Sequence, residues 1–399
     1  MLDVEEAQQR IISAIQPLAV ETISLRNAAG RVLAQSVAAP ISLPPFDNSA
    51  MDGYALRAAD VVNASADSPA PLQCMGAVAA GATFGNIVES KTCVRLFTGS
   101  PLPSGADAVV MQEDTREAGK FIEVLDAVKP WENVRLTGQD VKHGATIACA
   151  GERLNAARLG LLGAVGIESI QVSTQPVVGI LSTGNELIEP GRPLAPGQIY
   201  ESNRLAMASL VTQFGAVARV YPLVRDSLEA TRGALEAAFA ECDAVITTGG
   251  VSVGEHDVVK AAFDAMGGTL EFWKVAMKPG KPFVFGRFGK KFLFGLPGNP
   301  VSAFVTFLLL ARPAILKLQG AQDASLPAHP GVLAEPLQNR GARRHFMRVQ
   351  VDAAGQVRSA GGQASHALSS WARANALVSV PPETLWPSGA PVQVLRWEF

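Results

Sequence analysis

The stretch TTGGVSVGEHD, from Thr247 to Asp257, follows an apolar segment and combines glycines with carboxylates. Glycine lets the backbone approach a ligand closely and point its amides inward, which suits phosphate or another oxyanion. Carboxylates repel phosphate unless a cation lies between them, so Glu255 and Asp257 suggest Mg²⁺. The alternative is a glycine turn without a ligand, whose acidic residues cap the next helix. This stretch alone does not decide between a binding loop and a structural turn. The residues that would contact a ligand here are Gly249, Gly250, Ser252 and Gly254.

Other polar loops also follow apolar segments in this part of the chain. STGNE, from Ser182 to Glu186, comes after VVGIL, and GLPGNPVSA, from Gly295 to Ala303, comes after KFLF. Ligands of open α/β sheets bind beyond the carboxyl ends of the strands, so we expect all these loops on one rim. In the last loop, Asn299 is the predicted N-cap of a helix and Pro300 its first residue, which leaves free amides for an anion. A bare helix cap is the alternative, and the candidate contacts are Pro297, Gly298, Asn299 and Pro300.

The segment WKVAMKPGKPFVF places Lys274, Lys278 and Lys281 within eight residues. Lysines usually form a solvated face, but these are flanked by strand-like residues and by a Pro-Gly pair. Lysines at this edge of a sheet would neutralise phosphate as point charges. We therefore include the three lysines among the candidate phosphate contacts.

A polar cluster also occurs far earlier in the chain, in PPFDNSAMDGYALR. Asp52 lies there among other turn-forming and acidic residues, between the aromatic side chains of Phe46 and Tyr54. RLFTGSPLPSGADAVVMQED adds Thr98 where a predicted strand changes to a turn. Either stretch alone is also typical of a structural turn.

The motifs of several common enzyme classes are missing. The chain has no GxxxxGK[ST] loop, no GxGxxG after a strand, and neither HExxH nor GxSxG. Its five histidines show no metal-ligand spacing. The sequence therefore gives no support to a P-loop enzyme, a dinucleotide-binding enzyme or a Ser/His/Asp hydrolase.

Composition limits the class of protein further. A chain of 399 residues with 48% apolar and 18% charged residues indicates a globular protein of two to four domains. The net charge of −2 argues against a general nucleic-acid or membrane-surface binder, although a local basic patch remains open. The four cysteines form no CxxC pair, and the acidic N-terminal stretch is unlike a signal peptide, so we expect reduced thiols in a cytoplasmic protein. The apolar run from Val301 to Ala311 is too short to span a bilayer; we expect a buried core helix that Arg312 and Pro313 end.

The expected elements divide the chain. VEEAQQRIISAI has helical apolar spacing, and the proline-containing stretch after residue 42 breaks it. Short strands such as TCVRLF, ADAVVM and KFIEVL then predict a β-rich domain, followed by a strand, a turn and a helix that starts near Asn155.

From Pro176 onward, apolar strands alternate with helices. VVGIL, DAVITT and KFLFGL are strand-like, and Asn203 is the predicted cap of a helix that Gly215 ends. This alternation predicts βαβ units and a mostly parallel sheet covered on both faces. The tail after residue 322 returns to short strands and is predicted to be a separate β domain.

Taken together, the motifs resemble those of a known family. PPFDNSAMDGYA, TGSPLPSGADAVVMQE, LSTGNEL, TTGGVSVGEHD, FWKVAMKPGKPF and GLPGNPVSA occur in the order and at about the spacing of the molybdopterin molybdenumtransferases, the MoeA family. The C-terminal region of gephyrin belongs to the same group. The resemblance covers essentially the whole chain.

The resemblance implies a multidomain fold, a reaction and its participants. It implies an elongated chain with a central α/β molybdopterin-binding-like domain and further β-rich domains. The implied ranges are 1–43 with 137–173 for a discontinuous linker and dimerisation domain, 44–136 for a β-rich domain, 174–322 for the α/β domain and 323–399 for a C-terminal β domain. The implied reaction uses Mg²⁺ to insert molybdenum from molybdate into adenylylated molybdopterin, releasing AMP and molybdenum cofactor. The implied partners are a second copy of the chain, with the site in a cleft between subunits, the molybdopterin adenylyltransferase of the pathway, and downstream molybdoenzymes or cofactor carriers.

The resemblance also implies residue roles. Asp52, Glu186, Asp226 and Asp257 match the acidic set for metal and molybdate, with Glu186, Asp226 and Asp257 as the implied Mg²⁺ ligands. Lys274 and Lys278 match phosphate contacts, Lys281 is a further candidate, and Thr98 matches a polar residue of the β-rich domain. In the tail, RRHFMRVQ and GGQASHALSS imply roles for Arg348 and Ser365. Asn185 departs from the family, where many members have Asp, so a metal role is left to Glu186.

Alternatives to this function remain. A gephyrin-like scaffold without catalysis, an adenylyltransferase with a similar TGG loop, and a tungsten-inserting relative are all conceivable. Adenylyltransferases lack the β-rich and tail domains that are expected in this chain.

Overall fold

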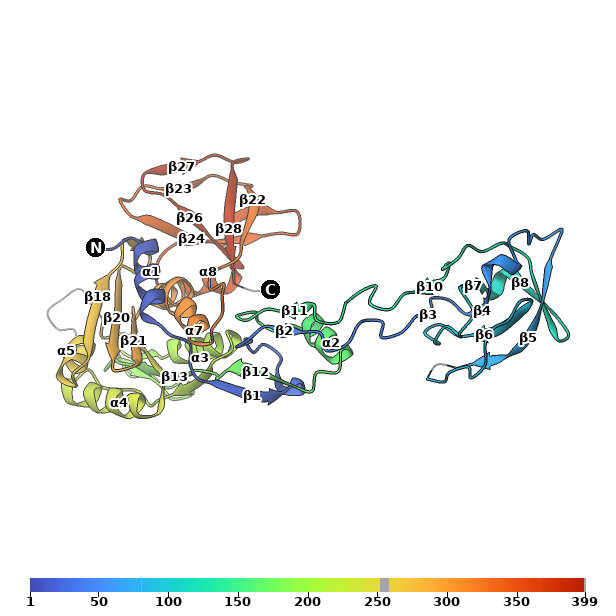
Figure 1. Ribbon diagram of the computed structural model, residues 1–399. Helices are drawn as coiled ribbons and strands as arrows, with labels where there is room; N and C mark the ends of the chain where they lie inside the picture. The colour runs from blue at the N-terminus through green and yellow to red at the C-terminus, as the bar shows by residue number, and fades with distance from the viewer. Residues whose placement is uncertain (80, 252–257, 398–399) are drawn as a thin grey trace.

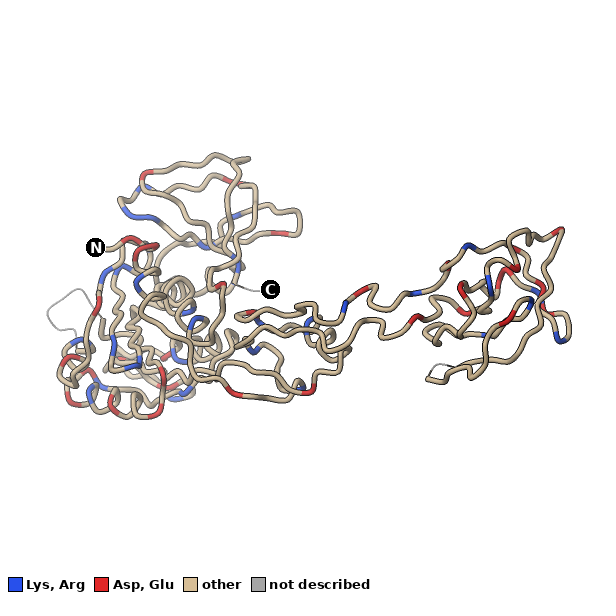
Figure 2. Tube along the Cα trace, viewed as in Figure 1, with Lys and Arg blue, Asp and Glu red and all other residues tan. Residues whose placement is uncertain are grey.

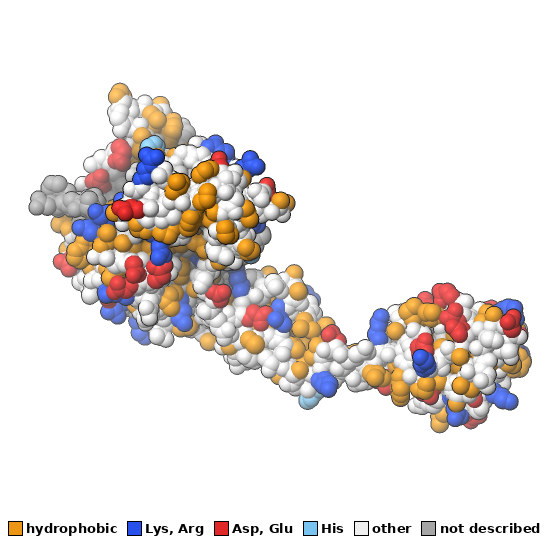
Figure 3. Space-filling model, turned by 90° about the horizontal axis from the view of Figure 1, so that it is seen from above, with side chains coloured by type: hydrophobic (Ala, Val, Ile, Leu, Met, Phe, Trp, Pro, Cys, Tyr) orange, Lys and Arg blue, Asp and Glu red, His pale blue; other side chains and the backbone are white. Residues whose placement is uncertain are grey.

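The computed structural model describes residues 1–79, 81–251 and 258–397, and the chain is elongated (Figure 1). An α/β unit and a C-terminal barrel lie together at one end, a slender middle region follows, and a β-rich distal lobe lies at the other end. Figure 3 shows that only a narrow neck joins the distal lobe to the rest. The predicted combination of an α/β domain with β-rich domains in an elongated chain is confirmed, whereas the four residue ranges stay a prediction.

The α/β unit contains a sheet of strand order β16-β13-β17-β21-β20-β18. Strands β16, β13, β17 and β21 are mutually parallel, and β20 runs antiparallel to both of its neighbours. The mostly parallel sheet is therefore confirmed. The strands are β13 (Val177–Ser182), β16 (Val217–Val220), β17 (Ala244–Thr248), β18 (Thr269–Lys274), β20 (Pro282–Phe288) and β21 (Lys291–Leu296).

Helices cover both faces of this sheet, which is why its central strands are mostly apolar and buried. Helices α1 (Val4–Ala14) and α3 (Asn203–Gln213) pack on one face, with Ile180 and Ile246 in the shared core. Helices α4 (Leu228–Glu241) and α5 (Val258–Ala265) pack on the other, against Val245 and Leu293. Successive strand residues point to opposite faces, so adjacent side chains such as Val245 and Ile246 enter different cores.

The apolar run near residue 300 forms a longer helix than expected. It comprises α6 (Pro300–Thr306), a π-helical turn (Phe307–Ala311) and α7 (Arg312–Leu318). The prediction that Arg312 and Pro313 end the helix is wrong. Pro313 stands in the first turn of α7, directly after the π-helical turn, where its missing amide is tolerated. The guanidinium of Arg312 lies 4.7 Å from the ring centroid of Phe214 and donates to the carbonyl of Ala324 at 2.8 Å.

The same helix is buried, as expected. By length and composition the 19 residues from Pro300 to Leu318 could span a membrane, but 89% of the apolar window is buried inside the protein. It is a core helix that packs beneath the sheet and against α1.

The start of α3 also differs from the prediction. Ser202, and not Asn203, is the N-cap, and the carboxylate of Glu201 accepts a hydrogen bond from the Arg204 amide at 2.8 Å. The side-chain amide of Asn203 instead donates to the carbonyl of Gly298 at 2.8 Å. The helix ends as predicted, because Gly215 follows with a φ of 87°.

The distal lobe is built on a sheet of strand order β7-β4-β6-β5-β9-β8. The predicted strands TCVRLF, ADAVVM and KFIEVL are confirmed as β6, β7 and β9. The strands are β4 (Gly53–Leu56), β5 (Ala70–Val78), β6 (Thr92–Leu96), β7 (Ala108–Met111), β8 (Thr115–Ala118) and β9 (Phe121–Val124).

The neck consists of the two chain segments that enter and leave this lobe. Strand β3 (Asn48–Ser49) pairs with β10 (Val134–Arg135), and the carboxylate of Asp47 accepts from both the amide and the hydroxyl of Thr137 at 2.7 Å. The two crossings therefore hold each other in register.

The middle region is formed by short antiparallel pairs and one helix. Strand β1 (Val20–Ser24) pairs with β12 (Ser169–Ser173), and β2 (Val37–Ala38) pairs with β11 (Thr146–Ala148). Helix α2 (Ala156–Ala164) begins after Asn155, whose side chain accepts from the Arg158 amide at 2.8 Å, as expected for the predicted helix start.

The C-terminal barrel closes on itself. Strands β24, β25, β22, β28 and β26 pair in that order, and β26 pairs back to β24. A short strand of the α/β unit, β19 (Met277–Lys278), adds to this barrel in parallel beside β24. The barrel strands are β22 (Ala328–Leu333), β24 (Arg344–Val351), β25 (Gln356–Ser359), β26 (Ala376–Val380) and β28 (Pro391–Arg396).

Candidate functional site

The three polar loops after β13, β17 and β21 meet at one rim of the sheet, as predicted from the sequence. Because these strands are parallel, their carboxyl ends lie at the same edge. The Thr183 amide donates to the carbonyl of Thr248 at 3.1 Å, and the Gly249 amide donates to the carbonyl of Leu296 at 3.2 Å. The loops are therefore joined through their backbones.

The described glycines of the middle loop allow this close approach. A Cβ atom on Gly249, whose φ is 83°, would lie 2.6 Å from the carbonyl oxygen of Thr183. A Cβ atom on Gly250 would lie 2.7 Å from the Thr183 hydroxyl. Any side chain at these positions would push the loops apart. Ser252, Gly254 and Asp257, which the sequence analysis also assigns to the site, lie outside the described residues.

Two of the predicted carboxylates lie on neighbouring loops. Glu186 and Asp226 are exposed, and their loops are joined because the Gly184 amide donates to the carbonyl of Val224 at 3.2 Å. The side-chain oxygen of Asn185 accepts from the Asp226 amide at 3.2 Å, so Asn185 orients the next loop. Within the described part of the chain, no basic side chain forms an ion pair with Glu186 or Asp226.

A basic pocket of about 470 Å³ lies at the same rim. It brings together residues that are distant in sequence: Lys278, Lys281, Asn299, Ser302, Arg343 and Ser365. The side-chain amide of Asn299 donates to the Ser365 hydroxyl at 3.1 Å. No Asp or Glu is among its lining residues, all of which the structure describes, so the pocket favours an anion.

The start of the helix at this pocket is less open than predicted. Asn299 is the N-cap by position but makes no side-chain cap bond, and Pro300 is the first residue. The Val301 amide is not free, because it donates to the carbonyl of Ser365 at 3.1 Å. The anion-binding capacity here depends on the basic side chains more than on helix amides.

Arg348 is buried next to this pocket and does not line it. Its guanidinium donates to the carbonyls of Gly362 and Ala364 at 2.6 and 3.1 Å, and its amide donates to the side chain of Gln363 at 3.0 Å. Burial lowers the pKa of Arg348 to about 10. Arg348 therefore holds the segment that presents Ser365.

Lys274 lies at the same rim but away from the basic pocket. It is the last residue of β18, and β18 runs parallel to β21 because β20 is antiparallel to both. It lines a separate hollow of about 200 Å³ with Leu2 and Trp273.

Asp52 and Thr98 form a pair in the distal lobe. The amide and hydroxyl of Thr98 donate to Oδ1 of Asp52 at 2.7 and 2.8 Å. These bonds, with a smaller effect from the charge of Arg95, lower the pKa of Asp52. Asp52 directly precedes strand β4, and Thr98 comes shortly after strand β6. Figure 1 shows both strands at the opposite end of the chain from the rim. A single chain thus does not bring Asp52 and Thr98 to the other predicted residues.

Three parts of the site were not predicted from the sequence. Arg343 lines the basic pocket and donates to the carbonyl of Met277 at 2.7 Å. His345 is buried beside Lys278, and burial, Lys278, Arg348 and Arg343 together lower its pKa to about 4. The arginine cluster of RGARRHF was the available signal for both.

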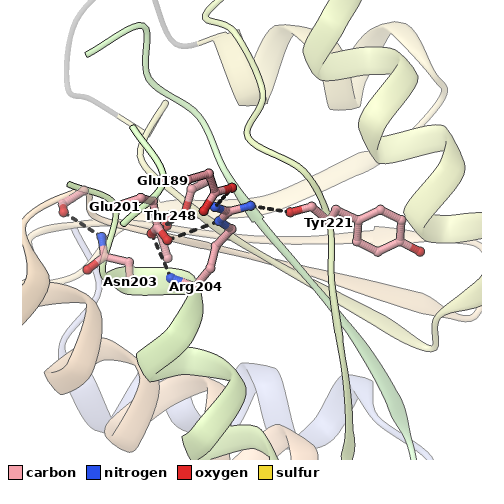
Figure 4. A network of polar contacts seen from close by, with 8 residues as sticks. Glu189, Glu201, Asn203, Arg204, Tyr221 and Thr248 are labelled. Atoms are coloured by element: carbon pink, nitrogen blue, oxygen red, sulfur yellow. Dashed lines mark hydrogen bonds and ion pairs between the residues drawn. The ribbon is translucent and has the colours of Figure 1, made fainter. Parts of the chain in front are cut away.

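The third missed part is a buried polar network under the rim (Figure 4). Glu201 and Arg204, each 5% exposed, form an ion pair at the start of α3. The adjacent residues ESNR, which span the start of helix α3, gave the only signal.

Basic and acidic residues are interspersed over all parts of the chain (Figure 2). The positive character of the pocket is therefore local and comes from Lys278, Lys281 and Arg343. It is not part of an extended basic face.

Comparison with known families covers nearly the whole chain. Residues 2–166 match the MoeA N-terminal region (domain I and II), residues 179–317 a probable molybdopterin binding domain, and residues 330–397 the MoeA C-terminal region (domain IV). The matches therefore include both ends of the chain as well as its α/β unit.

Individual relatives agree with the family matches. A molybdopterin molybdenumtransferase of Haemophilus influenzae is 39% identical, with 96% of this chain and 95% of the relative aligned. Molybdopterin molybdenumtransferase 2 of Mycobacterium tuberculosis is 37% identical over the full length of both chains. The crystal structure of a MoeA protein of molybdopterin biosynthesis from Pyrococcus horikoshii OT3 superposes with a TM-score of 0.86 at 31% identity, covering all of both chains. The chain therefore belongs to the MoeA family of molybdopterin molybdenumtransferases and is a transferase of molybdenum cofactor biosynthesis.

Proposed function

We propose that this chain inserts molybdenum from molybdate into adenylylated molybdopterin and releases AMP and molybdenum cofactor. The observation that carries the proposal is that a basic pocket lies at the same rim of the α/β sheet as Glu186 and Asp226, which have no basic partner among the described residues. The substrate contains a pyrophosphate, and molybdate is an oxyanion, so both need cationic contacts. Cleavage of the pyrophosphate also needs its charge to be neutralised.

The basic pocket is the proposed anion site. Lys278, Lys281 and Arg343 supply positive charge, and the hydroxyl of Ser365 is held by Asn299. Ammonium groups neutralise phosphate as point charges, whereas the planar guanidinium can bind two oxygens at once. Lys274, on the neighbouring edge strand, would extend the positive rim toward a second phosphate.

The carboxylates fit a magnesium ion. Mg²⁺ prefers oxygen ligands and is usually held by one or two carboxylates together with substrate phosphates. Glu186 and Asp226 meet this description, because their oxygens have no basic partner in the described part of the chain and their loops are joined. Glu186 and Asp226 would hold the ion, with Asp257 as a further proposed ligand outside the described residues. When bound, Mg²⁺ would neutralise the phosphate charge that develops as AMP leaves.

A second copy of the chain is proposed to supply Asp52 and Thr98. Within one chain this pair lies at the opposite end from the rim (Figure 1). A symmetric dimer could place the distal lobe of each subunit over the rim of the other, forming two equivalent sites. Asp52, kept ionised by Thr98, would then act on the bound substrate.

The direct test uses purified protein with adenylylated molybdopterin, Mg²⁺ and molybdate, and measures AMP and active cofactor. Both products should appear together and only when every component is present. Replacing molybdate by tungstate tests whether tungsten is also accepted. Consumption of ATP with free molybdopterin would instead identify an adenylyltransferase, and the absence of either activity would support a scaffold.

Mixing two inactive variants tests the shared site. Asp52→Asn should fold normally yet release no AMP, and Lys278→Ala should bind substrate poorly. After the subunits exchange, about half of the dimers are mixed and each has one intact site, so about a quarter of the normal activity should return. Normal turnover by Asp52→Asn would remove Asp52 from the mechanism, and no recovery on mixing would refute a site shared between subunits.

We further propose that the reaction takes place in the cytoplasm. The molybdopterin adenylyltransferase of the pathway would supply the substrate. Downstream molybdoenzymes or cofactor carriers would accept the product.

A further inference from the structure

The start of helix α3 holds a buried ion pair that the proposed reaction does not use. The carboxylate of Glu201 accepts from the Arg204 amide at 2.8 Å and from its side-chain Nε at 3.2 Å. It also accepts from the hydroxyl of Ser182 at 3.0 Å, and that hydroxyl lies 2.5 Å from the hydroxyl of Thr248. The ion pair thus reaches the last residues of both β13 and β17.

Arg204 extends the same network to the loops that carry the carboxylates (Figure 4). Its guanidinium donates to the carbonyl of Tyr221 at 2.6 Å, at the start of the loop that leads to Asp226. It also donates to the carboxylate of Glu189 at 2.6 Å, in the loop that carries Glu186. One side chain therefore fixes both carboxylate loops relative to the sheet.

Stability alone does not require this pair. Burying two charges costs free energy that their attraction does not reliably return, and apolar replacements of similar volume are often neutral or stabilising. What a satisfied buried network supplies is one defined arrangement of the segments that it joins. Here those segments carry the two exposed acidic side chains that are the proposed metal ligands.

We propose that Glu201 and Arg204 are positioning residues that hold Glu186 and Asp226 at the spacing needed for a divalent cation. The inference rests on the proposed function, since it assigns a support to the metal site named there. Neither residue touches the reacting atoms. Outer residues of this kind typically change metal affinity about 10–100-fold when they are replaced.

The test compares the wild type with the double variant Glu201→Gln/Arg204→Met. Removing both charges avoids the penalty of a single unpaired buried charge, so the melting temperature should stay close to that of the wild type. Mn²⁺ binding to the full-length, substrate-free protein is measured by EPR titration, and the dissociation constant should rise about 10–100-fold. Asp226→Asn, which removes a proposed ligand, should show a loss at least as large.

Hydrogen exchange provides a readout that needs no metal. The Gly184 amide donates to Val224, and the Val224 amide donates to Ser182, so both report on the joined loops. Their exchange should be faster in the double variant, while the Val301 amide, bonded to Ser365 at the basic pocket, should be unchanged. The matched control Arg232→Met/Glu236→Gln removes an exposed ion pair on α4 and should alter neither measurement.

The possible outcomes are distinct. If Asp226→Asn weakens Mn²⁺ binding but the double variant binds as the wild type does, the positioning role is refuted and the proposed metal site stands. If the wild type shows no Mn²⁺ binding that depends on Asp226, the metal site fails and the positioning role fails with it. A uniform rise in exchange across the α/β unit, with a large drop in melting temperature, would show a merely structural pair.

Discussion

Lys278 and His345 lie side by side in parallel register, Lys278 on β19 of the α/β unit and His345 on β24 of the barrel. This contact brings a cation next to a buried imidazole, and two arginines, Arg343 and Arg348, add to the positive charge around it. Burial, together with these positive charges, keeps His345 neutral and lowers its pKa to about 4.

The acid stability of the protein should reflect this neutral histidine. His345 in the unfolded chain takes up a proton near its ordinary pKa of 6.5, whereas the folded protein resists protonation down to about pH 4. The contribution of neutral His345 to the free energy of unfolding is therefore complete above pH 6.5. It is lost as the pH falls from 6.5 to about 4. In thermal melts between pH 7 and pH 4.5, His345→Gln should lose less stability than the wild type. Parallel losses in the two proteins would contradict the assignment.

The hydroxyl of Thr98 should set the acid limit of activity. The amide of Thr98 and then its hydroxyl lower the pKa of Asp52, which must be ionised in the proposed reaction. Thr98→Val keeps the amide bond but loses the hydroxyl, so the pKa of Asp52 should rise. The acid limb of the pH profile of AMP release should then move to higher pH. Thr115→Val, which removes a hydroxyl bond to Gln112 in the same lobe, is the control and should leave the limb in place.

Lys278→Ala should weaken substrate binding more than it lowers the melting temperature. The side chain is exposed and lines the basic pocket, so its removal costs an ionic contact and little packing. Binding of inorganic phosphate and of molybdate can be measured by calorimetry together with thermal melts. Lys290→Ala, an exposed lysine in the turn between β20 and β21, is the matched control. If Lys278→Ala lost binding and stability in equal measure, the lysine would be structural.

Gly249→Ala should disturb the rim in two ways. The added Cβ atom would clash with the backbone of Thr183, and the positive φ would strain the alanine backbone. Gly249 and Gly191 have similar φ values of 83° and 90°, but only at Gly249 would a Cβ atom meet the backbone, 2.6 Å from the Thr183 carbonyl. Alanine at a positive φ costs about 1–2 kcal/mol at either position. Gly249→Ala should therefore destabilise the protein more than Gly191→Ala and should also reduce AMP release. Equal effects on melting temperature, with full activity in both, would show that the close approach has no function.

Much of the α/β unit could be predicted because its central strands are buried on both faces. VVGIL is apolar throughout and DAVITT has an apolar centre, and the glycine loops after them mark the carboxyl ends of parallel strands. The length of the helix from Pro300 to Leu318 could not be predicted, because it depends on a π-helical turn and on a tertiary site for the Arg312 guanidinium.

The candidate site could be predicted only where its chemistry shows in short motifs. Lys278 and Lys281 were predicted because they occur close together between strand-like residues, and Asn299 because it follows a predicted strand. The structure places all three around one pocket. Arg348 matched a motif, but its burial and its bonds to backbone carbonyls depend on the barrel. RGARRHF and ESNR are only weak signals for Arg343 and for the pair formed by Glu201 and Arg204, because the pocket and the network that give these residues a role are formed by distant elements.

The two-residue strand β19 makes the C-terminal barrel a support for the turn from Met277 to Lys281. Replacing this barrel with one from a relative would change the wall beside Lys278, and cutting the chain before the barrel would remove that wall. Anyone who builds a chimera from members of this family would need to transfer that turn and the barrel together as one unit.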